Sequence, residues 1–126
     1  MRDHTEGLVE VERCGLLRWV TGPTLIAAGI EILPAPGETP GHQMVRVQSQ
    51  GRTLYCMADV YHHVSEIVNG DWHPAAADRT ANRATRAQLV EAALREDAQL
   101  IATHLPGIGR FVRGAVGVAW QGVDVS

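Results

Sequence analysis

A short loop rich in proline and glycine, residues 35–42, most constrains what this chain folds into. It reads Ala-Pro-Gly-Glu-Thr-Pro-Gly-His and lies between two runs of strand-forming residues. Each proline fixes its own φ angle, and each glycine permits backbone angles closed to other residues, so the loop is shaped rather than floppy. It ends on His42, whose imidazole is therefore held in place. Taken alone, a histidine after such a turn is more often a surface or packing residue than a ligand.

The residues after this loop predict strands and one long helix. Residues 43–48 include alternating polar and apolar side chains, as in a half-buried strand, and residues 53–58 are nearly all apolar, as in a strand covered on both faces. A helix is expected from residue 78 or 80 to about 96, covering a sheet, followed by a short buried strand at 99–103. The predicted buried face of the helix consists of Ala87, Val90 and Leu94.

The remaining segments give weaker patterns. We expect a short helix over residues 5–13, a strand over 16–20, one or two short strands within 24–33, and a C-terminal hairpin over 111–121. Residues 60–78 have the length of a functional loop.

Length and charge place the chain among ordinary globular proteins. Its 126 residues predict a single domain, 1–126, and the net charge of −3 without a basic cluster argues against nucleic acid as a partner. No apolar run approaches a membrane span, and the start lacks the apolar core of a secretion signal, so we expect no membrane partner and a cytoplasmic location. Cys14 and Cys56 are interpreted as small buried hydrophobic residues.

Two further polar residues follow predicted buried strands in the way that His42 follows its loop. Asp59 ends one strand and His104 ends the other. In a layered α/β fold the ends of strands form one rim, so the three side chains are expected to converge there. Imidazole and carboxylate are good ligands for zinc, iron and manganese. Their spacing of 17 and 45 residues matches no local metal motif, and a capping or turn role for Asp59 stays open.

The order of these motifs resembles that of the metallo-β-lactamase superfamily. The resemblance rests on the 36–42 loop, a strand, a turn at Gly51, a strand ending Ala58-Asp59, and a helix and strand ending His104-Leu105-Pro106. It covers roughly residues 15–122. Residues 59–63 and 104–110 look most similar to the branch of lactonases and organophosphate hydrolases. The resemblance implies half of an αββα sandwich: a mixed sheet with one main covering helix.

The resemblance also implies roles for particular residues. His42 would bind a first zinc ion, Asp59 would bridge two, and His104 would bind the second. Such metals lower the pKa of a bridging water and polarise a substrate carbonyl or phosphoryl oxygen. His62 and His63 match a histidine pair common in that branch, for which we expect loop packing or support of the site.

Several departures from the family pattern have consequences. Glu38 stands where the family usually has a histidine, and Ala58 where a glycine usually precedes the aspartate. The family's His-x-His-x-Asp-His motif is absent, and Asp3-His4 is a poor candidate for its remnant. His4 and His73 are interpreted as surface residues.

Two hypotheses follow for function, and enzyme activity stays uncertain between them. In the first, the chain is the C-terminal part of a zinc-dependent hydrolase of esters, lactones or related bonds, incomplete without an N-terminal half. In the second, it is a non-catalytic half-domain that assembles through its exposed sheet face, as a homodimer or with a partner that supplies the missing half. A mononuclear iron site using His42, Asp59 and His104 ranks last.

Overall fold

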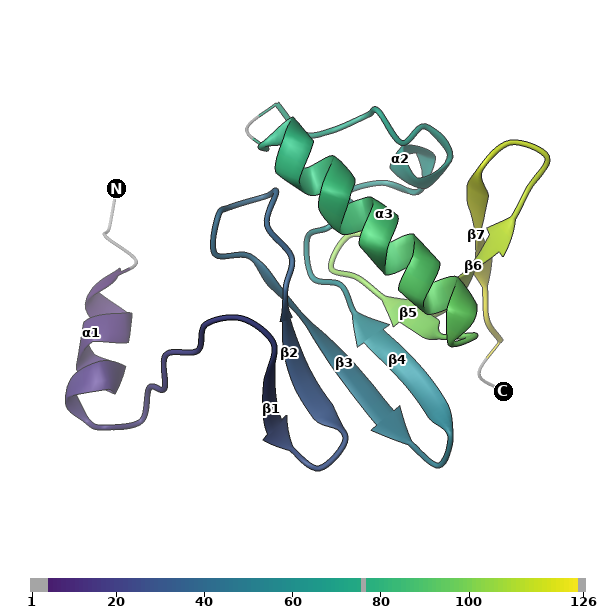
Figure 1. Ribbon diagram of the computed structural model, residues 1–126. Coiled ribbons are helices and arrows are strands. Elements are labelled where there is room, and N and C mark those ends of the chain that lie inside the picture. The colour runs from purple at the N-terminus through teal and green to yellow at the C-terminus, as the bar shows by residue number, and fades with distance from the viewer. Residues whose placement is uncertain (1–4, 76, 125–126) are drawn as a thin grey trace.

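The computed structural model describes residues 5–75 and 77–124, and its centre is one mixed seven-stranded sheet (Figure 1). The strands lie side by side in the order of the sequence, and every neighbouring pair is antiparallel except β4 and β5. This confirms the predicted mixed sheet. The strands are β1 (Thr24–Ala27), β2 (Ile30–Pro34), β3 (Gln43–Ser49), β4 (Arg52–Cys56), β5 (Gln99–Ile101), β6 (Gly109–Arg113) and β7 (Val118–Gly122).

Tight turns set the register of the first four strands. Gln50 and Gly51 both have positive φ, 51° and 74°, in the two-residue connection between β3 and β4. Such a turn matches the right-handed twist of the strands that it joins. Only glycine fits at position 29, between β1 and β2, because a Cβ there would lie 2.3 Å from the carbonyl oxygen of Gln48.

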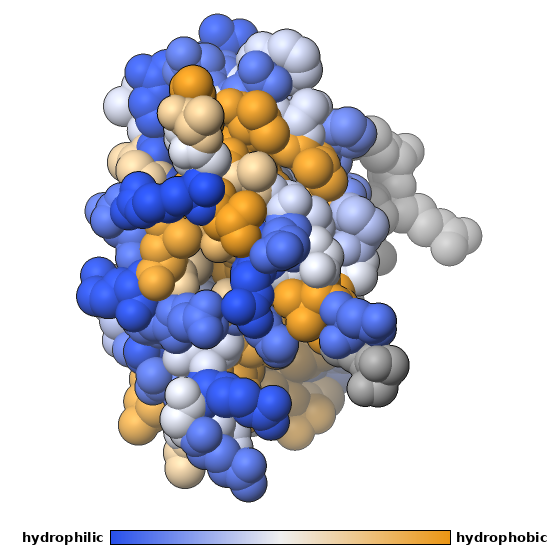
Figure 2. Space-filling view, turned by 90° about the vertical axis from the view of Figure 1, so that its right-hand side faces the viewer, coloured by the Kyte–Doolittle hydropathy of each residue, from blue (hydrophilic) through white to orange (hydrophobic). Residues whose placement is uncertain are grey.

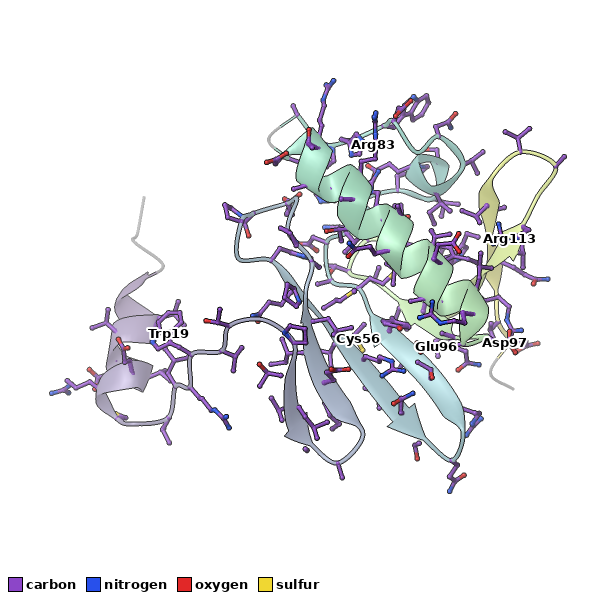
Figure 3. The ribbon with its side chains drawn as sticks, viewed as in Figure 1. Trp19, Cys56, Arg83, Glu96, Asp97 and Arg113 are labelled. Atoms are coloured by element: carbon purple, nitrogen blue, oxygen red, sulfur yellow. The ribbon has the colours of Figure 1, made fainter. Side chains whose placement is uncertain are left out.

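The parallel pair β4–β5 needs a crossover, which α3 (Arg79–Arg95) supplies. Asp78 caps this helix by accepting a hydrogen bond from the Ala81 amide at 3.0 Å. At the other end, Glu96 bonds the Arg46 guanidinium at 3.1 Å, which ties the helix to β3, and Figure 3 shows Glu96 and Asp97 together at this end.

The predicted buried face of α3 was wrong in part. Ala87 is exposed, whereas Val90 and Leu94 pack at the margin of the core. Three polar residues occupy the buried face because each bonds a loop below it, as described for the site. The residues that α3 buries are Asn82, Thr85, Arg86, Leu89 and Ala93.

The core lies between α3 and the sheet. Tyr55 from β4, Leu100 from β5 and Leu89 from α3 are all at most 2% exposed. Fully burying a side chain of the size of leucine contributes about 1.5–3 kcal/mol, so these contacts fix the helix on this face.

Other expectations need correction. Residues 16–20 form no strand, since the polypeptide there has no partner strand among the described residues, and Cys14 is exposed. The 60–78 segment contains a short helix, α2 (Val64–Val68). His4 and the Asp3-His4 pair, both interpreted from the sequence above, lie outside the described residues.

Helix α1 (Thr5–Arg13) projects away from the sheet together with the segment after it (Figure 1). Leu8 and Val9 are more than half exposed, and Leu16 is 79% exposed. Trp19 donates its indole N–H to Glu12 at 2.7 Å, so this arm folds against itself, as Figure 3 shows.

The sheet face opposite α3 carries apolar side chains in rows. Because Ile32 pairs with Val45, Val45 with Cys56, and Cys56 with Ile101, these four residues lie side by side on one face. All four are only partly buried, and α2 and α3 both lie over the other face (Figure 1). We call this surface the open sheet face. No helix in the described ranges is both long and apolar enough to cross a membrane.

Candidate functional site

Helix α3 holds the 35–42 loop in place. The Thr85 hydroxyl donates to the Pro36 carbonyl at 2.7 Å, and the Asp78 amide donates to the Gly37 carbonyl at 2.8 Å. Gly37 has φ 151°, and a Cβ at this position would lie 2.6 Å from Asn82 Cα. The loop is therefore shaped, as predicted, and it sits directly on the start of the helix.

The sheet register brings the three predicted ligands together. Cys56 and Ile101 are paired in the parallel strands, and Asp59 and His104 each follow three residues later. Val45 and Cys56 are paired in the antiparallel strands, and stepping three residues outward from them reaches His42 and Asp59. The 17 residues between His42 and Asp59, and the 45 between Asp59 and His104, therefore follow from the register of β3, β4 and β5, because each of the three residues lies three positions beyond a paired residue.

His42 is held by backbone groups on both sides of its ring. Its Nε2 accepts a hydrogen bond from the Asp59 amide at 3.1 Å, so the proton must sit on Nδ1, which donates to the Ala35 carbonyl at 2.9 Å. The imidazole is neutral in this arrangement. It ties the loop to the end of β4, and its Nε2 lone pair is not directed at a metal.

Asp59 and His104 face each other. His104 Nε2 lies 3.4 Å from Asp59 Oδ1, and the two side chains are 43% and 38% exposed. Asp59 Oδ1 is shielded from solvent but accepts no hydrogen bond. Ala58, at the position where the resemblance expects glycine, has φ 47°. The tight turn after β4 explains that preference, because a residue with a Cβ is strained there.

A second imidazole and carboxylate lie beside this pair. His62 Nε2 is 3.2 Å from Glu38 Oε2, and the His62 ring lies on that of His104 with 4.7 Å between the centroids. Both the His62 nitrogen and the Glu38 oxygen are shielded from solvent without a hydrogen bond. His62 therefore lies beside the Asp59–His104 pair, and the expectation that it packs in its loop or supports the site stays a prediction.

Arg86 organises the loop that carries His62. Its guanidinium donates to the Val60 carbonyl at 3.0 Å, the Trp72 carbonyl at 2.6 Å and the Glu66 carboxylate at 2.5 Å. It also lies over the Tyr61 ring, 4.4 Å from the centroid, and burial raises the pKa of Tyr61 to about 12.

Glu66 in turn accepts a hydrogen bond from the His62 amide at 3.1 Å. The Arg86–Glu66 pair was missed from the sequence. The sequence feature that could have revealed this pair is the helical spacing of Arg86 from Asn82 and Leu89, which places all three on the buried face of α3.

The other histidines in this loop have local roles. His63 is exposed and caps α2 through a hydrogen bond from the Ser65 amide at 3.1 Å. His73, predicted to be a surface residue, is partly buried instead, because its Nδ1 lies 3.0 Å from Asn82 Oδ1.

The donor chemistry suits a metal ion, but the arrangement is incomplete. Asp59 and His104 fit, since Asp59 Oδ1 is buried without a hydrogen bond beside an imidazole nitrogen. His42 does not fit as it stands, because its Nε2 is taken. Among residues 5–75 and 77–124, no three histidine, cysteine or acidic side chains are grouped to hold a metal.

A groove of about 410 Å³ lies elsewhere, between α2, α3 and the β6–β7 hairpin. Ile67, Val68, Val90 and Val118 line it together with Arg83. Figure 2 looks at the side of the molecule that carries β6 and β7 and shows hydrophobic residues gathered among hydrophilic ones.

Comparisons with known proteins identify the fold. No protein-family model and no curated protein matches the chain. Among solved structures, AidC, a dizinc quorum-quenching lactonase, matches with a TM-score of 0.77 and 22% identity over 98% of this chain and 46% of AidC. The hydrolase AbOPH, of the beta lactamase superfamily, matches with a TM-score of 0.79 and 16% identity over 97% of this chain and 43% of its own.

A probable metal-dependent hydrolase from Staphylococcus aureus also matches, with a TM-score of 0.70 and 15% identity over 85% of this chain and 40% of its own. The chain therefore spans less than half the length of each of these hydrolases. It has the fold of that part of a metallo-β-lactamase sandwich, as the sequence predicted.

Proposed function

We propose that this chain, which folds as half of a metallo-β-lactamase sandwich, is the C-terminal part of a zinc-dependent hydrolase of esters, lactones or related bonds. The observation that carries the proposal is the meeting of Asp59 and His104 at the ends of paired parallel strands, with His42 hydrogen-bonded to the same turn. The lactonase and hydrolase structures that share the fold support the same reaction class.

Each residue has a distinct part in the proposed site. Asp59 and His104 would hold the metal, and His42 would be a further ligand only where its Nε2 does not accept the hydrogen bond from the Asp59 amide. Zinc, when bound, would supply an activated water and polarise the substrate's carbonyl or phosphoryl group, whose carbon or phosphorus the water attacks.

The chain's own contribution is positioning. The 35–42 loop is fixed by hydrogen bonds from the Thr85 hydroxyl of α3 and from the amide of Asp78, which caps α3. The turn after β4 is fixed by backbone hydrogen bonds with Ile101 of β5 and with Thr103.

The site needs residues from outside this sequence. The His-x-His-x-Asp-His motif is absent, and catalytic zinc commonly has three protein ligands and an open position. We propose that these ligands come from a segment packed on the open sheet face, whose apolar rows are only partly buried.

A chimera tests the proposal. This chain replaces the matching part of AidC, and hydrolysis of an N-acyl-homoserine lactone is measured with and without added zinc. We expect zinc-dependent activity in the chimera and its loss in Asp59→Asn and His104→Ala. A folded chimera that binds zinc but has no activity above the Asp59→Asn background would overturn the proposal.

The open sheet face also favours a second candidate function, an assembly module without catalysis. In that case two copies pair through this face, and the chain is a homodimer. Sedimentation equilibrium of the isolated chain, compared with Val45→Glu, measures this. A dimer that dissociates on Val45→Glu supports assembly, and a monomer at all concentrations contradicts it.

A further inference from the structure

Helix α1 and residues 14–20, which we call the arm, gather exposed apolar side chains at one end of the molecule (Figure 1). Ten large hydrophobic side chains are exposed in the described part of the chain, and five of them belong to the arm. These five are Leu8, Val9, Val11, Leu16 and Trp19. An exposed apolar surface of this kind marks a site of interaction with another protein.

Internal hydrogen bonds fix the shape of the arm. The Trp19 indole N–H donates to Glu12 at 2.7 Å, and the Leu16 amide donates to the Val11 carbonyl at 3.1 Å. In this shape Trp19 is 71% exposed and lies with α1, away from the sheet (Figures 1 and 3). The arm therefore presents its apolar side chains to a second molecule and not to the core of its own chain.

An apolar groove of about 330 Å³ lies at the base of the arm, between β2, β4 and α3. Leu33 and Met44 line it from the sheet, Leu89 and Ala92 line it from α3, and Pro23 lines it from the segment that joins the arm to β1. The groove is on the face of the sheet that carries α3, and it is thus separate from the open sheet face.

The groove matches the arm in chemistry. Exposed Gln88 lies on its wall and offers an amide oxygen that can accept the indole N–H, which a buried tryptophan requires. Arg95, 70% exposed, follows Ala92 by three residues on the same side of α3. Helix α1 contains three glutamates and one arginine, so its charge is complementary to Arg95.

The positions of arm and groove favour exchange between two copies of this chain. Trp19 is only four residues from Pro23, so the donor and the acceptor surfaces lie at the same end of the molecule. A two-fold axis at this end places each arm on the other copy's groove, and such an arrangement is closed. The groove between α2, α3 and the β6–β7 hairpin lies at the opposite end from α1 and would give an open chain of copies (Figure 1).

The size of the apolar surface is also sufficient. Burying one aromatic side chain removes about 150–250 Å² from water, so two arms with five large side chains each would bury on the order of 1,000 Å². With the grooves counted as well, the total reaches the range of about 1,200–2,000 Å² found in specific interfaces.

We propose that two copies of this chain form a dimer by exchanging their arms, with Trp19 of each copy in the groove between β2, β4 and α3 of the other. The open sheet face takes no part in this dimer and stays free for the segment that would complete the hydrolase site. The inference therefore goes beyond the proposed function and does not depend on it.

Sedimentation equilibrium of the full chain and its variants tests the exchange. Trp19→Gln in the arm and Ala92→Glu in the groove are each expected to raise the dimer dissociation constant by about tenfold or more. Trp72→Gln is the matched control, since Trp72 is also exposed, at 57%, but lies outside the arm. Val45→Glu, on the open sheet face, should likewise leave the dimer unchanged.

Mixing the two weakened variants tests whether the contact is made between copies. The Ala92→Glu copy keeps its Trp19, and the Trp19→Gln copy keeps its groove, so the mixed dimer has one intact contact and should be tighter than the dimer of either variant alone. Circular dichroism checks that each variant is folded, and Gln88→Ala replaces Ala92→Glu if that variant unfolds.

Three results would overturn the inference. The first is a chain that stays monomeric over the whole concentration range, and the second is a mixture no tighter than the separate variants. The third is a dimer that Val45→Glu dissociates and Trp19→Gln does not, which would support assembly through the open sheet face instead. The AidC chimera tests the hydrolase proposal separately.

Discussion

Replacing Arg86 by methionine is expected to destabilise the protein more than replacing any exposed arginine of the same helix. The Arg86 and Glu66 side chains are only 5% and 11% exposed, so water screens their pairing little. Removing one partner of a buried ion pair costs about 3–5 kcal/mol, because the other charge stays buried and unpaired. Two carbonyl acceptors, of Val60 and Trp72, lose their donor as well.

Urea unfolding followed by circular dichroism measures this loss. The free energy of unfolding of a typical protein is about 5–15 kcal/mol, so the loss expected for Arg86→Met is a large share of it. Arg83→Met is the matched control: Arg83 lies on the same helix and pairs with Asp71 of the loop before it, but the two side chains are 67% and 82% exposed. An exposed pair contributes about 0–1 kcal/mol.

A double variant separates pairing from packing. Because a buried pair replaced entirely by apolar groups is often close to neutral, Arg86→Met combined with Glu66→Met should be less destabilised than the sum of the single variants by about 1 kcal/mol or more. A loss below about 1 kcal/mol for Arg86→Met alone would refute the argument that this pair organises the loop after β4.

Three further changes probe the backbone and the buried phenol. Gly37→Ala should cost about 1–3 kcal/mol, because its Cβ would lie 2.6 Å from Asn82, whereas Gly41→Ala meets nothing within 4 Å and should be close to neutral in urea unfolding. Ala58→Gly should stabilise by up to about 1 kcal/mol, since relief of about 1–2 kcal/mol of strain at φ 47° exceeds the added entropy of the unfolded chain; a lower urea midpoint would contradict this. Burial raises the Tyr61 pKa to about 12 from 10.0, so the free energy of unfolding should hold below pH 10 and fall by about 2 kcal/mol as pH rises to 12. Tyr61→Phe should remove that part of the pH dependence, and an unchanged profile would show that Tyr61 is not its source.

Much of the fold was predictable because local patterns agree with it. The alternation in β3, the apolar run of β4 and the capped helix α3 each follow from hydrophobic periodicity and chain punctuation. The prediction of a strand at residues 16–20 was wrong because an apolar sequence forms a strand only beside a partner strand. Here the segment lies beside α1 instead.

The buried face of α3 shows what periodicity misses. Ala87 was chosen because it is apolar, yet Thr85 and Arg86 are buried since each bonds a loop carbonyl. A polar side chain becomes a core residue when a partner is present, and that partner is distant in sequence.

The sequence predicted that His42, Asp59 and His104 would lie near one another, but not how their side chains are engaged. Asp59 and His104 meet because they occupy equivalent places after the paired residues of β4 and β5. The engagement of His42 by the Asp59 amide and the contact of His62 with Glu38 depend on side-chain directions in loops, which no sequence period specifies.

The most direct measurement for the proposed hydrolase site is a crystal structure of the AidC chimera with data collected at the zinc absorption edge. The account predicts an anomalous peak in contact with an Asp59 carboxylate oxygen and His104 Nε2. A zinc peak that touches neither side chain, or no peak in a crystal of the zinc-treated chimera, would contradict it.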